Sequence, residues 1–190
     1  MKKIFLALIF IMVTHVVIAQ KIKWGLKAGA NITDFTGSNI QNVKEKALIG
    51  FHAGFLVAFK FGSFYLQPEL IVSTAGAKYE NVDSSFKLIY LSAPLMLKYR
   101  TASGIYFEIG PQVGFKLSEN ISKQTVEGFA KNLDLSAAAG IGFQTKKGFG
   151  IGGRYLAGLS KVGDFITTPS ADPDIKNSIL QIGISIPFGK

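Results

Sequence analysis

Residues 105–117 read IYFEIGPQVGFKL, and bulky apolar residues occupy every second position of this stretch. The odd-numbered positions are Ile105, Phe107, Ile109, Pro111, Val113, Phe115 and Leu117. The even-numbered positions are Tyr106, Glu108, Gly110, Gln112, Gly114 and Lys116. Apart from the tyrosine, the second set is charged, polar or very small. Because side chains alternate between the two faces of a strand, the pattern predicts a β-strand with one apolar face. The rest of the chain decides whether that face meets a protein core or lipid.

The first residues have the composition of a secretory signal peptide. Lys2 and Lys3 precede an apolar run that extends to Ala19. The run is shorter than the roughly 20 residues that a transmembrane helix needs, which argues against the alternative of a membrane anchor. We therefore expect residues 1–19 to form a signal peptide and residues 20–190 to form one outer-membrane β-barrel domain.

Composition narrows the classes of partner. The chain of 190 residues contains no Cys, so neither disulfides nor a thiolate metal site contributes to its stability. Its formal net charge is +9, and loss of the two lysines of the signal peptide leaves +7. The Lys and Arg residues are not gathered into one tract, and for a protein that we expect to be exported we expect no nucleic-acid partner. The basic balance therefore favours anionic lipid or a polyanionic glycan as the counter-charge.

Seven further runs share the alternation of the first stretch. Together the eight runs cover residues 21–32, 48–61, 64–74, 86–99, 105–117, 132–145, 148–159 and 177–188. Their lengths suit tilted transmembrane strands. The connections alternate between long and tight. The long ones are 33–47, 74–85, 118–131 and 160–176, and the tight ones are 62–63, 100–104 and 146–147. This arrangement predicts an all-β protein, an eight-stranded antiparallel up-and-down transmembrane β-barrel with both termini in the periplasm.

The content of the two faces predicts which one meets lipid. An eight-stranded barrel has an interior only just wide enough for side chains, so it cannot enclose all the bulky residues. We therefore expect the apolar face to point outward and the charged face to point inward. The predicted interior polar network consists of Lys27, His52, Lys60, Glu69, Lys98, Glu108, Lys116, Asp134 and Arg154. The predicted periplasmic aromatic girdle consists of Trp24, Phe61, Phe64, Tyr99, Phe107, Phe149 and Phe188.

Several runs, taken in order, resemble the PorT-like family of bacterial outer-membrane β-barrels. They include KWGLKAGANITDF, GFHAGFLVAF, FYLQPELIVSTAGAKY, YLSAPLMLKY, FEIGPQVGFKL and GFGIGGRYLAGLSKV. The order of LQPEL and GPQVG is the most specific part. The resemblance implies an outer-membrane barrel, sometimes labelled a porin-family protein, and for the namesake members an accessory role in secretion. One departure is that Phe188 is followed by two more residues, whereas such barrels often end on an aromatic residue.

Three features resemble catalytic or cofactor-binding sites, but a structural role explains each of them better. Gly148, Gly150 and Gly153 spell the dinucleotide fingerprint, but no helical period follows them, so we expect them to thin out the barrel interior. His52 is the one His beyond the signal peptide and is assigned to the interior network rather than to catalysis. Glu69 is expected to neutralise interior cations. We expect no catalytic residues, no cofactor and no metal.

The sequence predicts a non-enzymatic barrel with a structural or accessory role, linked to secretion or to contacts of its long outer loops. Expected partners are outer-membrane lipid and envelope or secretion proteins, with no nucleic acid. The loop lysines that we expect to contact lipopolysaccharide phosphates are Lys44, Lys46, Lys123, Lys131 and Lys161. Three alternatives stay open: a small ion or solute channel, a secreted soluble barrel of lipocalin type with an apolar ligand, and a lipid-modifying enzyme that uses His52.

Overall fold

Eight β-strands make up the part of the chain that the computed structural model describes, which is residues 21–36, 45–79, 84–121, 132–161 and 176–188. The predicted signal peptide lies outside the described residues. The strands are β1 (Lys21–Thr36), β2 (Glu45–Phe61), β3 (Phe64–Tyr79), β4 (Ser84–Arg100), β5 (Ile105–Ile121), β6 (Leu133–Gln144), β7 (Gly150–Gly158) and β8 (Lys176–Phe188). Within these ranges no helix is long and apolar enough to span a membrane.

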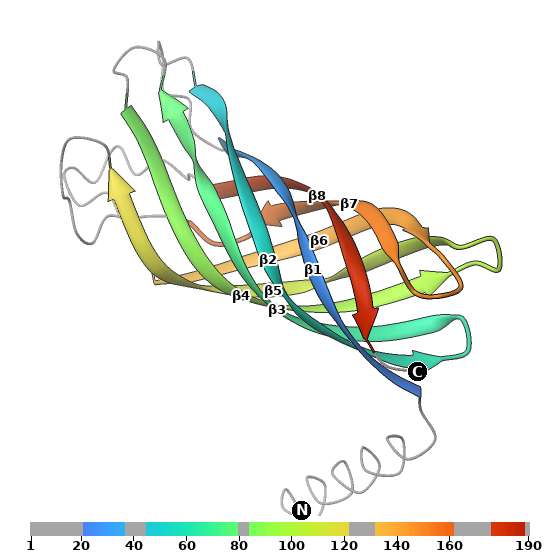
Figure 1. Cartoon of the computed structure of the whole chain (residues 1–190). Coiled ribbons are helices and arrows are strands. Elements are labelled where there is room, and N and C mark those ends of the chain that lie inside the picture. Colours follow the sequence, from blue (N-terminus) through green and yellow to red (C-terminus); the bar gives the residue numbers. More distant parts are fainter. Residues whose placement is uncertain (1–20, 37–44, 80–83, 122–131, 162–175, 189–190) are drawn as a thin grey trace, which may run out of the picture.

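The strands close into a barrel (Figure 1). Each strand pairs antiparallel with the next, and β1 also pairs with β8, where Trp24 lies opposite Phe188. The predicted eight-stranded antiparallel barrel is therefore confirmed. The start of β1, the end of β8 and the three tight turns lie at one end of the barrel, which we call the terminal rim. The other end is the opposite rim. Closure pairs every strand with a neighbour on both sides through the body of the barrel.

The apolar face of the strands points away from the barrel axis. In β5 the side chain of Ile109 is 63% exposed, whereas its neighbour Glu108 is 6% exposed. The same alternation of exposed apolar and buried polar residues runs along β6 and β8. The barrel interior thus contains the charged side chains together with some apolar ones, such as Ile71, Leu88 and Met96, and its outer surface is an apolar belt. This outer surface argues against the soluble lipocalin alternative, because a barrel of that type presents polar side chains to water.

The strands reach further toward the opposite rim than the alternation predicts. The prediction of a long connection over residues 74–85 is wrong. Most of these residues belong to strands, because β3 and β4 stay paired as far as Tyr79 and Ser84. The alternation fails there because Thr74 and Ala75 are both buried, each 1% exposed. Likewise β1, β2 and β5 extend beyond the predicted 32, 48 and 117.

Glycines set the geometry of the tight turns at the terminal rim. Gly62 and Gly104 have φ of 61° and 102°, a backbone conformation that residues with a Cβ atom rarely adopt. The amide of Gly104 donates a hydrogen bond to the Thr101 carbonyl at 3.1 Å, which closes the turn between β4 and β5. These turns fix the register of the strand pairs that they connect.

Candidate functional site: an ion-pair network across the lumen

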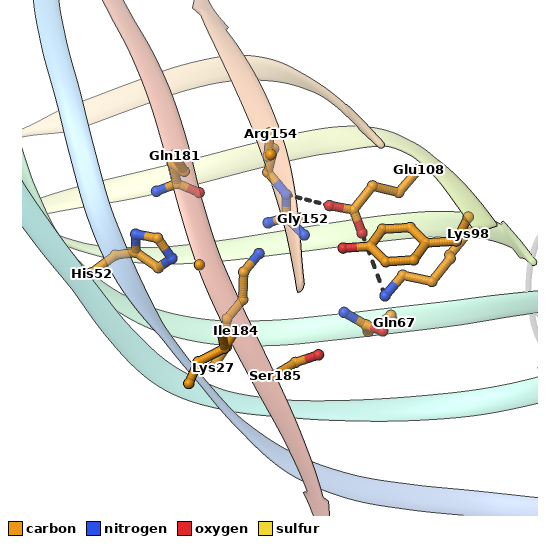
Figure 2. A pocket seen from close by; sticks show the side chains of 13 residues that line it. Lys27, His52, Gln67, Lys98, Glu108, Gly152, Arg154, Gln181, Ile184 and Ser185 are labelled. Carbon is orange, nitrogen blue, oxygen red and sulfur yellow. Dashed lines mark hydrogen bonds and ion pairs between the residues drawn. The ribbon is translucent and has the colours of Figure 1, made fainter. Parts of the chain in front are cut away.

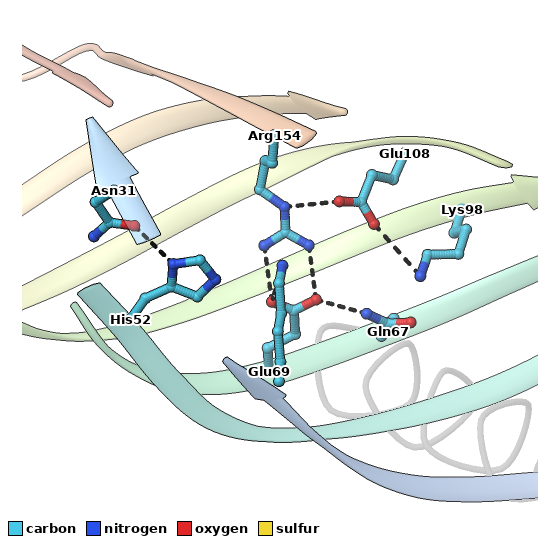
Figure 3. Close-up of polar contacts among 8 residues, drawn as sticks. Asn31, His52, Gln67, Glu69, Lys98, Glu108 and Arg154 are labelled. Atoms are coloured by element: carbon cyan, nitrogen blue, oxygen red, sulfur yellow. Dashed lines mark hydrogen bonds and ion pairs between the residues drawn. The ribbon is translucent and has the colours of Figure 1, made fainter. Parts of the chain in front are cut away.

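Arg154 lies at the centre of the barrel interior and is bound by two carboxylates (Figure 3). Its Nη1 and Nη2 atoms donate to the two carboxylate oxygens of Glu69 at 2.8 and 2.7 Å. Its Nε atom donates to Oε1 of Glu108 at 2.8 Å. The side chain of Arg154 is 2% exposed. Because these hydrogen bonds are charge-assisted and one pair is bidentate, they belong to the strongest and most directional class.

Two lysines and a glutamine extend this contact. The Nζ atom of Lys98 lies 3.6 Å from Glu108 Oε2, and the Nζ atom of Lys27 lies 3.5 Å from Glu69 Oε2. The amide of Gln67 donates to Glu69 Oε1 at 2.6 Å. We call these six residues the central network. They come from β1, β3, β4, β5 and β7, so the network spans the lumen rather than following its wall.

Gly140 on β6 provides the space that lets β5 and β7 side chains meet. It pairs with Glu108 on one side and with Arg154 on the other. A Cβ atom at Gly140 would lie 3.0 Å from both Cγ and Oε1 of Glu108. Any side chain here would push Glu108 away from Arg154. The strand pair β4–β5 adds the third member directly, because Lys98 and Glu108 are register partners.

Tyr106 projects into the lumen on the terminal-rim side of Glu108 and is buried. The Lys98 ammonium lies 4.2 Å from the centroid of the tyrosine ring, within range of a cation–π interaction. The tyrosine hydroxyl occupies the positions that side chains at Gly142 and Gly152 would fill. Glycines therefore do make room for larger side chains inside the barrel, as the sequence predicts. Gly153, however, is on the outward face, where a Cβ atom would meet only the Gln181 carbonyl oxygen, at 3.8 Å.

His52 is held by Asn31 in a defined orientation. The Asn31 Nδ2 atom donates to Ser73 Oγ and to the Thr74 carbonyl, each at 2.9 Å, which fixes the orientation of the amide. Its Oδ1 atom must then accept the 2.7 Å hydrogen bond from His52 Nδ1. Nδ1 therefore carries a proton, and Nε2 lies beside Gly183 of β8, 3.0 Å from where a Cβ atom of that residue would be. The ring is shown in Figure 2.

A small cavity lies between His52 and the central network (Figure 2). Its volume is about 20 Å³, enough for one or two water molecules. Lys27, Lys98 and Arg154 contribute to its lining, together with the carboxylate of Glu108. The cavity can therefore hydrate the network, and it is too small for a solute the size of a metabolite.

The remaining predicted network residues are in other places. Lys60 is exposed at the terminal rim, with its Nζ atom 5.9 Å from the centroid of the Tyr65 ring. Asp134 accepts hydrogen bonds from Ser136 and Asn177 at 2.8 and 3.0 Å, apart from the central network. Lys116 is half-buried on β5, in register with Tyr90 of β4. Sequence reasoning did not assign Gln67, Asn31, Tyr106 or Gln181 to the site, although they share the inward parity of the residues that it did assign.

All seven residues of the predicted aromatic girdle have exposed side chains next to the terminal rim, six on strand ends and Phe149 in the turn before β7. They are Trp24, Phe61, Phe64, Tyr99, Phe107, Phe149 and Phe188. Phe64 and Tyr99 are register partners, and their ring centroids are 5.1 Å apart. Amphipathic and aromatic rings at the edge of an apolar belt are typical of the boundary between hydrocarbon and headgroups.

Residues 18–164 match the protein family described as "Outer membrane protein beta-barrel domain". The chain belongs to this family. None of the curated proteins compared with the chain matches it. The fold of this family member is similar to that of the solved Neisserial surface protein A (NspA), with a TM-score of 0.57 and 15% identity over 87% of this chain and 97% of that one. It is also similar to Ail, the attachment invasion locus protein of Yersinia pestis, solved with the heparin analogue sucrose octasulfate. That match has a TM-score of 0.52 and 15% identity over 88% of this chain and 99% of Ail.

The family and the outward apolar belt together assign the protein to the outer membrane as an integral eight-stranded β-barrel. At 15% identity the two solved structures are alike in fold alone. In the lumen of this chain, three cations and two carboxylates meet across the barrel axis.

Proposed function

We propose that this barrel is a closed, non-enzymatic accessory protein of the outer membrane, exported by its signal peptide and inserted with both termini in the periplasm. Its lumen does not conduct. Its work is done by the segments at the opposite rim, which contact envelope or secretion proteins and the phosphates of lipopolysaccharide. The lysines proposed for the phosphate contacts are Lys44, Lys46, Lys123, Lys131 and Lys161, of which Lys44, Lys123 and Lys131 lie outside the described residues.

The observation that carries the proposal is the central network. Arg154 bonds to Glu69 across the lumen, since β7 and β3 are not neighbours in the barrel. An ion entering from either rim must break or bypass these charge-assisted hydrogen bonds, and removing one partner of such a buried pair leaves the other charge uncompensated. The cavity beside the network accommodates no more than one or two water molecules.

Two further observations support an accessory role without enzymatic activity. His52, the candidate base of a lipid-modifying enzyme, donates from Nδ1 to the neutral amide of Asn31, rather than to a carboxylate that would orient it for catalysis. The resemblance to PorT-like proteins supports a role linked to secretion. That role requires partners in the envelope, because a barrel of this width is filled by its own side chains.

Planar-bilayer recordings test whether the lumen is closed. We expect no unitary conductance from the wild-type protein and measurable openings from Arg154→Ala, which removes the centre of the network. Lys60→Ala is the matched control, because it removes an exposed cation at the terminal rim. Wild-type openings that Arg154→Ala does not increase would instead favour the small-channel alternative, for which the chain of polar side chains inside the barrel is the supporting observation.

A complementation experiment tests the accessory role separately. A strain that lacks the protein should export less of its secreted proteins, and the wild-type chain should restore their export. A variant in which residues 122–131 are replaced by a short Gly-Ser segment should enter the outer membrane and show the heat-dependent gel mobility of a closed barrel, but fail to restore export. Full restoration by this variant would contradict a role for that segment in partner contact.

A further inference from the structure

The basic residues of this barrel are distributed differently from its acidic residues. Five basic side chains lie at the terminal rim: Lys23, Lys60, Arg100, Lys146 and Lys147. Within the eight strands, every Asp and Glu outside the central network lies in the half of the barrel that ends at the opposite rim: Asp34, Glu45, Glu119 and Asp134. The strands and turns described at the terminal rim therefore carry cations without carboxylates. We call the five cations the basic rim.

Three of the five cations of the basic rim are exposed to solvent, and one is held by a neighbouring strand. Lys60, Lys146 and Lys147 are exposed, and Lys23 is half-buried. The guanidinium group of Arg100 donates two hydrogen bonds to the Gln144 carbonyl oxygen, at 3.2 and 3.0 Å, which holds it against the neighbouring strand end. Among the residues that the structure describes, no carboxylate forms an ion pair with any of the five.

These cations are interleaved with the aromatic girdle. Lys23 precedes Trp24, Lys60 precedes Phe61, and Arg100 follows Tyr99. The two lysines of the β6–β7 turn stand next to the end of β8, because a Cβ atom at Gly148 would lie 2.7 Å from the Pro187 ring. Lys23, Lys60 and Arg100 have inward parity, opposite to these aromatic residues, but they lie at strand ends, where long side chains can extend their charged groups over the rim. The five cations therefore lie at the height where the apolar belt ends, at the level at which lipid headgroups surround a barrel.

We propose that the basic rim binds anionic phospholipid headgroups, of the phosphatidylglycerol type, in the membrane leaflet at the terminal rim. Cations beside a membrane surface attract anionic lipid, and the attraction falls off within a Debye length. A compact acidic protein would need the cations gathered on one face. Here they are spread from the β1–β2 edge and the β6–β7 turn to the β4–β5 turn, which suits several small headgroups around the barrel. The inference does not depend on the orientation of the barrel or on its proposed accessory role.

Trp24 is a built-in reporter for this test. It is the one tryptophan of the chain, its side chain is 61% exposed, and it lies between Lys23 and the β8 end beside the β6–β7 turn. The protein is reconstituted in vesicles that contain phosphatidylglycerol and phosphatidylcholine in equal amounts. In one set the acyl chains of the first lipid are brominated, and in the other set those of the second. Bromine quenches tryptophan fluorescence on contact, so the two quenching ratios report which lipid lies beside Trp24.

We expect brominated phosphatidylglycerol to quench Trp24 about twofold more than brominated phosphatidylcholine at low salt, and the difference to vanish in about 1 M NaCl. The variant Lys60→Gln/Lys146→Gln/Lys147→Gln should lose the preference. The control Lys78→Gln/Lys87→Gln/Lys176→Gln removes three cations nearer the opposite rim and should keep it. Equal quenching of the wild-type protein by the two lipids would overturn the proposal, and so would a preference that the rim variant retains.

Discussion

Arg154 and Glu69 lie on strands that are not neighbours, yet they face each other through two parallel hydrogen bonds of 2.8 and 2.7 Å inside the barrel. Both side chains are almost completely removed from solvent, with exposures of 2% and 0%. This bidentate pair ties β3 to β7 through the lumen. It therefore contributes a constraint that the ladder of backbone hydrogen bonds around the wall does not supply.

Substitution of Glu69 should destabilise the barrel strongly. Glu69→Gln leaves the Arg154 and Lys27 charges buried with one carboxylate fewer, and the loss of one partner from a buried pair costs about 3–5 kcal/mol. The free energy of unfolding is measured by urea titration in detergent, with the heat-dependent gel mobility as the readout. Lys60→Gln, at an exposed site, should change that free energy by less than about 0.5 kcal/mol. Equal midpoints and slopes for the two variants would contradict a stabilising network.

Two glycine substitutions separate packing inside the lumen from packing outside it. Gly140→Ala should lower the free energy of unfolding by about 1–3 kcal/mol, because its Cβ atom would lie 2.8 Å from the Gly153 carbonyl oxygen and 3.0 Å from the Glu108 carboxylate. Gly153→Ala is the matched control on the outward face, where the one atom nearby is 3.8 Å away. The same urea titration applies. The assignment of the two faces fails if Gly153→Ala is the more damaging change.

A charge placed on the apolar belt should oppose membrane insertion. Ile182 lies midway along β8, with its side chain 52% exposed, and Ile182→Arg should cost about 2–4 kcal/mol of stability in a bilayer. Ser103→Arg, in the exposed turn between β4 and β5, should have little effect. The folded fraction in vesicles, as a function of urea, measures both. An unaffected Ile182→Arg variant would be inconsistent with contact between this residue and hydrocarbon.

The Asn31 amide should fix the tautomer of His52. Because Asn31 Oδ1 accepts a 2.7 Å hydrogen bond from Nδ1, the proton resides on Nδ1 in the neutral ring. In the chain without residues 1–19, His52 is the single histidine, so a long-range ¹⁵N–¹H correlation spectrum gives one pattern. Nδ1 should have the shift of a protonated nitrogen and Nε2 that of an unprotonated one. Asn31→Ala should remove this preference, whereas a wild-type spectrum with the proton on Nε2 would refute the assigned amide orientation.

The direction of each side chain could be predicted from sequence, because a strand has a period of two and the membrane makes the two faces chemically distinct. Glu69, Glu108 and Arg154 were placed inside on that ground, and the structure has them buried. Their mutual contact could not be predicted. Glu69 and Arg154 are separated by 85 positions, and their meeting depends on the stagger of all the strands between them. The odd or even position of a residue in its strand determines whether its side chain faces the lumen or the lipid. The register and tilt of the strands determine where that side chain lies along the barrel axis.

The same reasoning explains why the sequence predicts Lys60 and Asp134 in the network although neither contacts it. Both have inward parity, but Lys60 lies at the terminal rim and Asp134 pairs with Ser136 and Asn177 elsewhere in the lumen. The strand ends near the opposite rim were underestimated for a different reason. At Thr74 and Ala75 two consecutive residues are buried, so the period of two is lost although the hydrogen-bonded ladder continues.

The pairing of β1 with β8 has a consequence for assembly. The strands that close the barrel are the first and the last of the eight in chain order, so Trp24 cannot meet Phe188 until all the strands between them are available. Contacts of such high sequence separation form slowly. Until the seam forms, the apolar belt and two unpaired strand edges are present in the same molecule, a combination prone to aggregation. The β1–β8 seam is therefore the contact that removes both hazards, since it pairs the two remaining edges and completes the barrel.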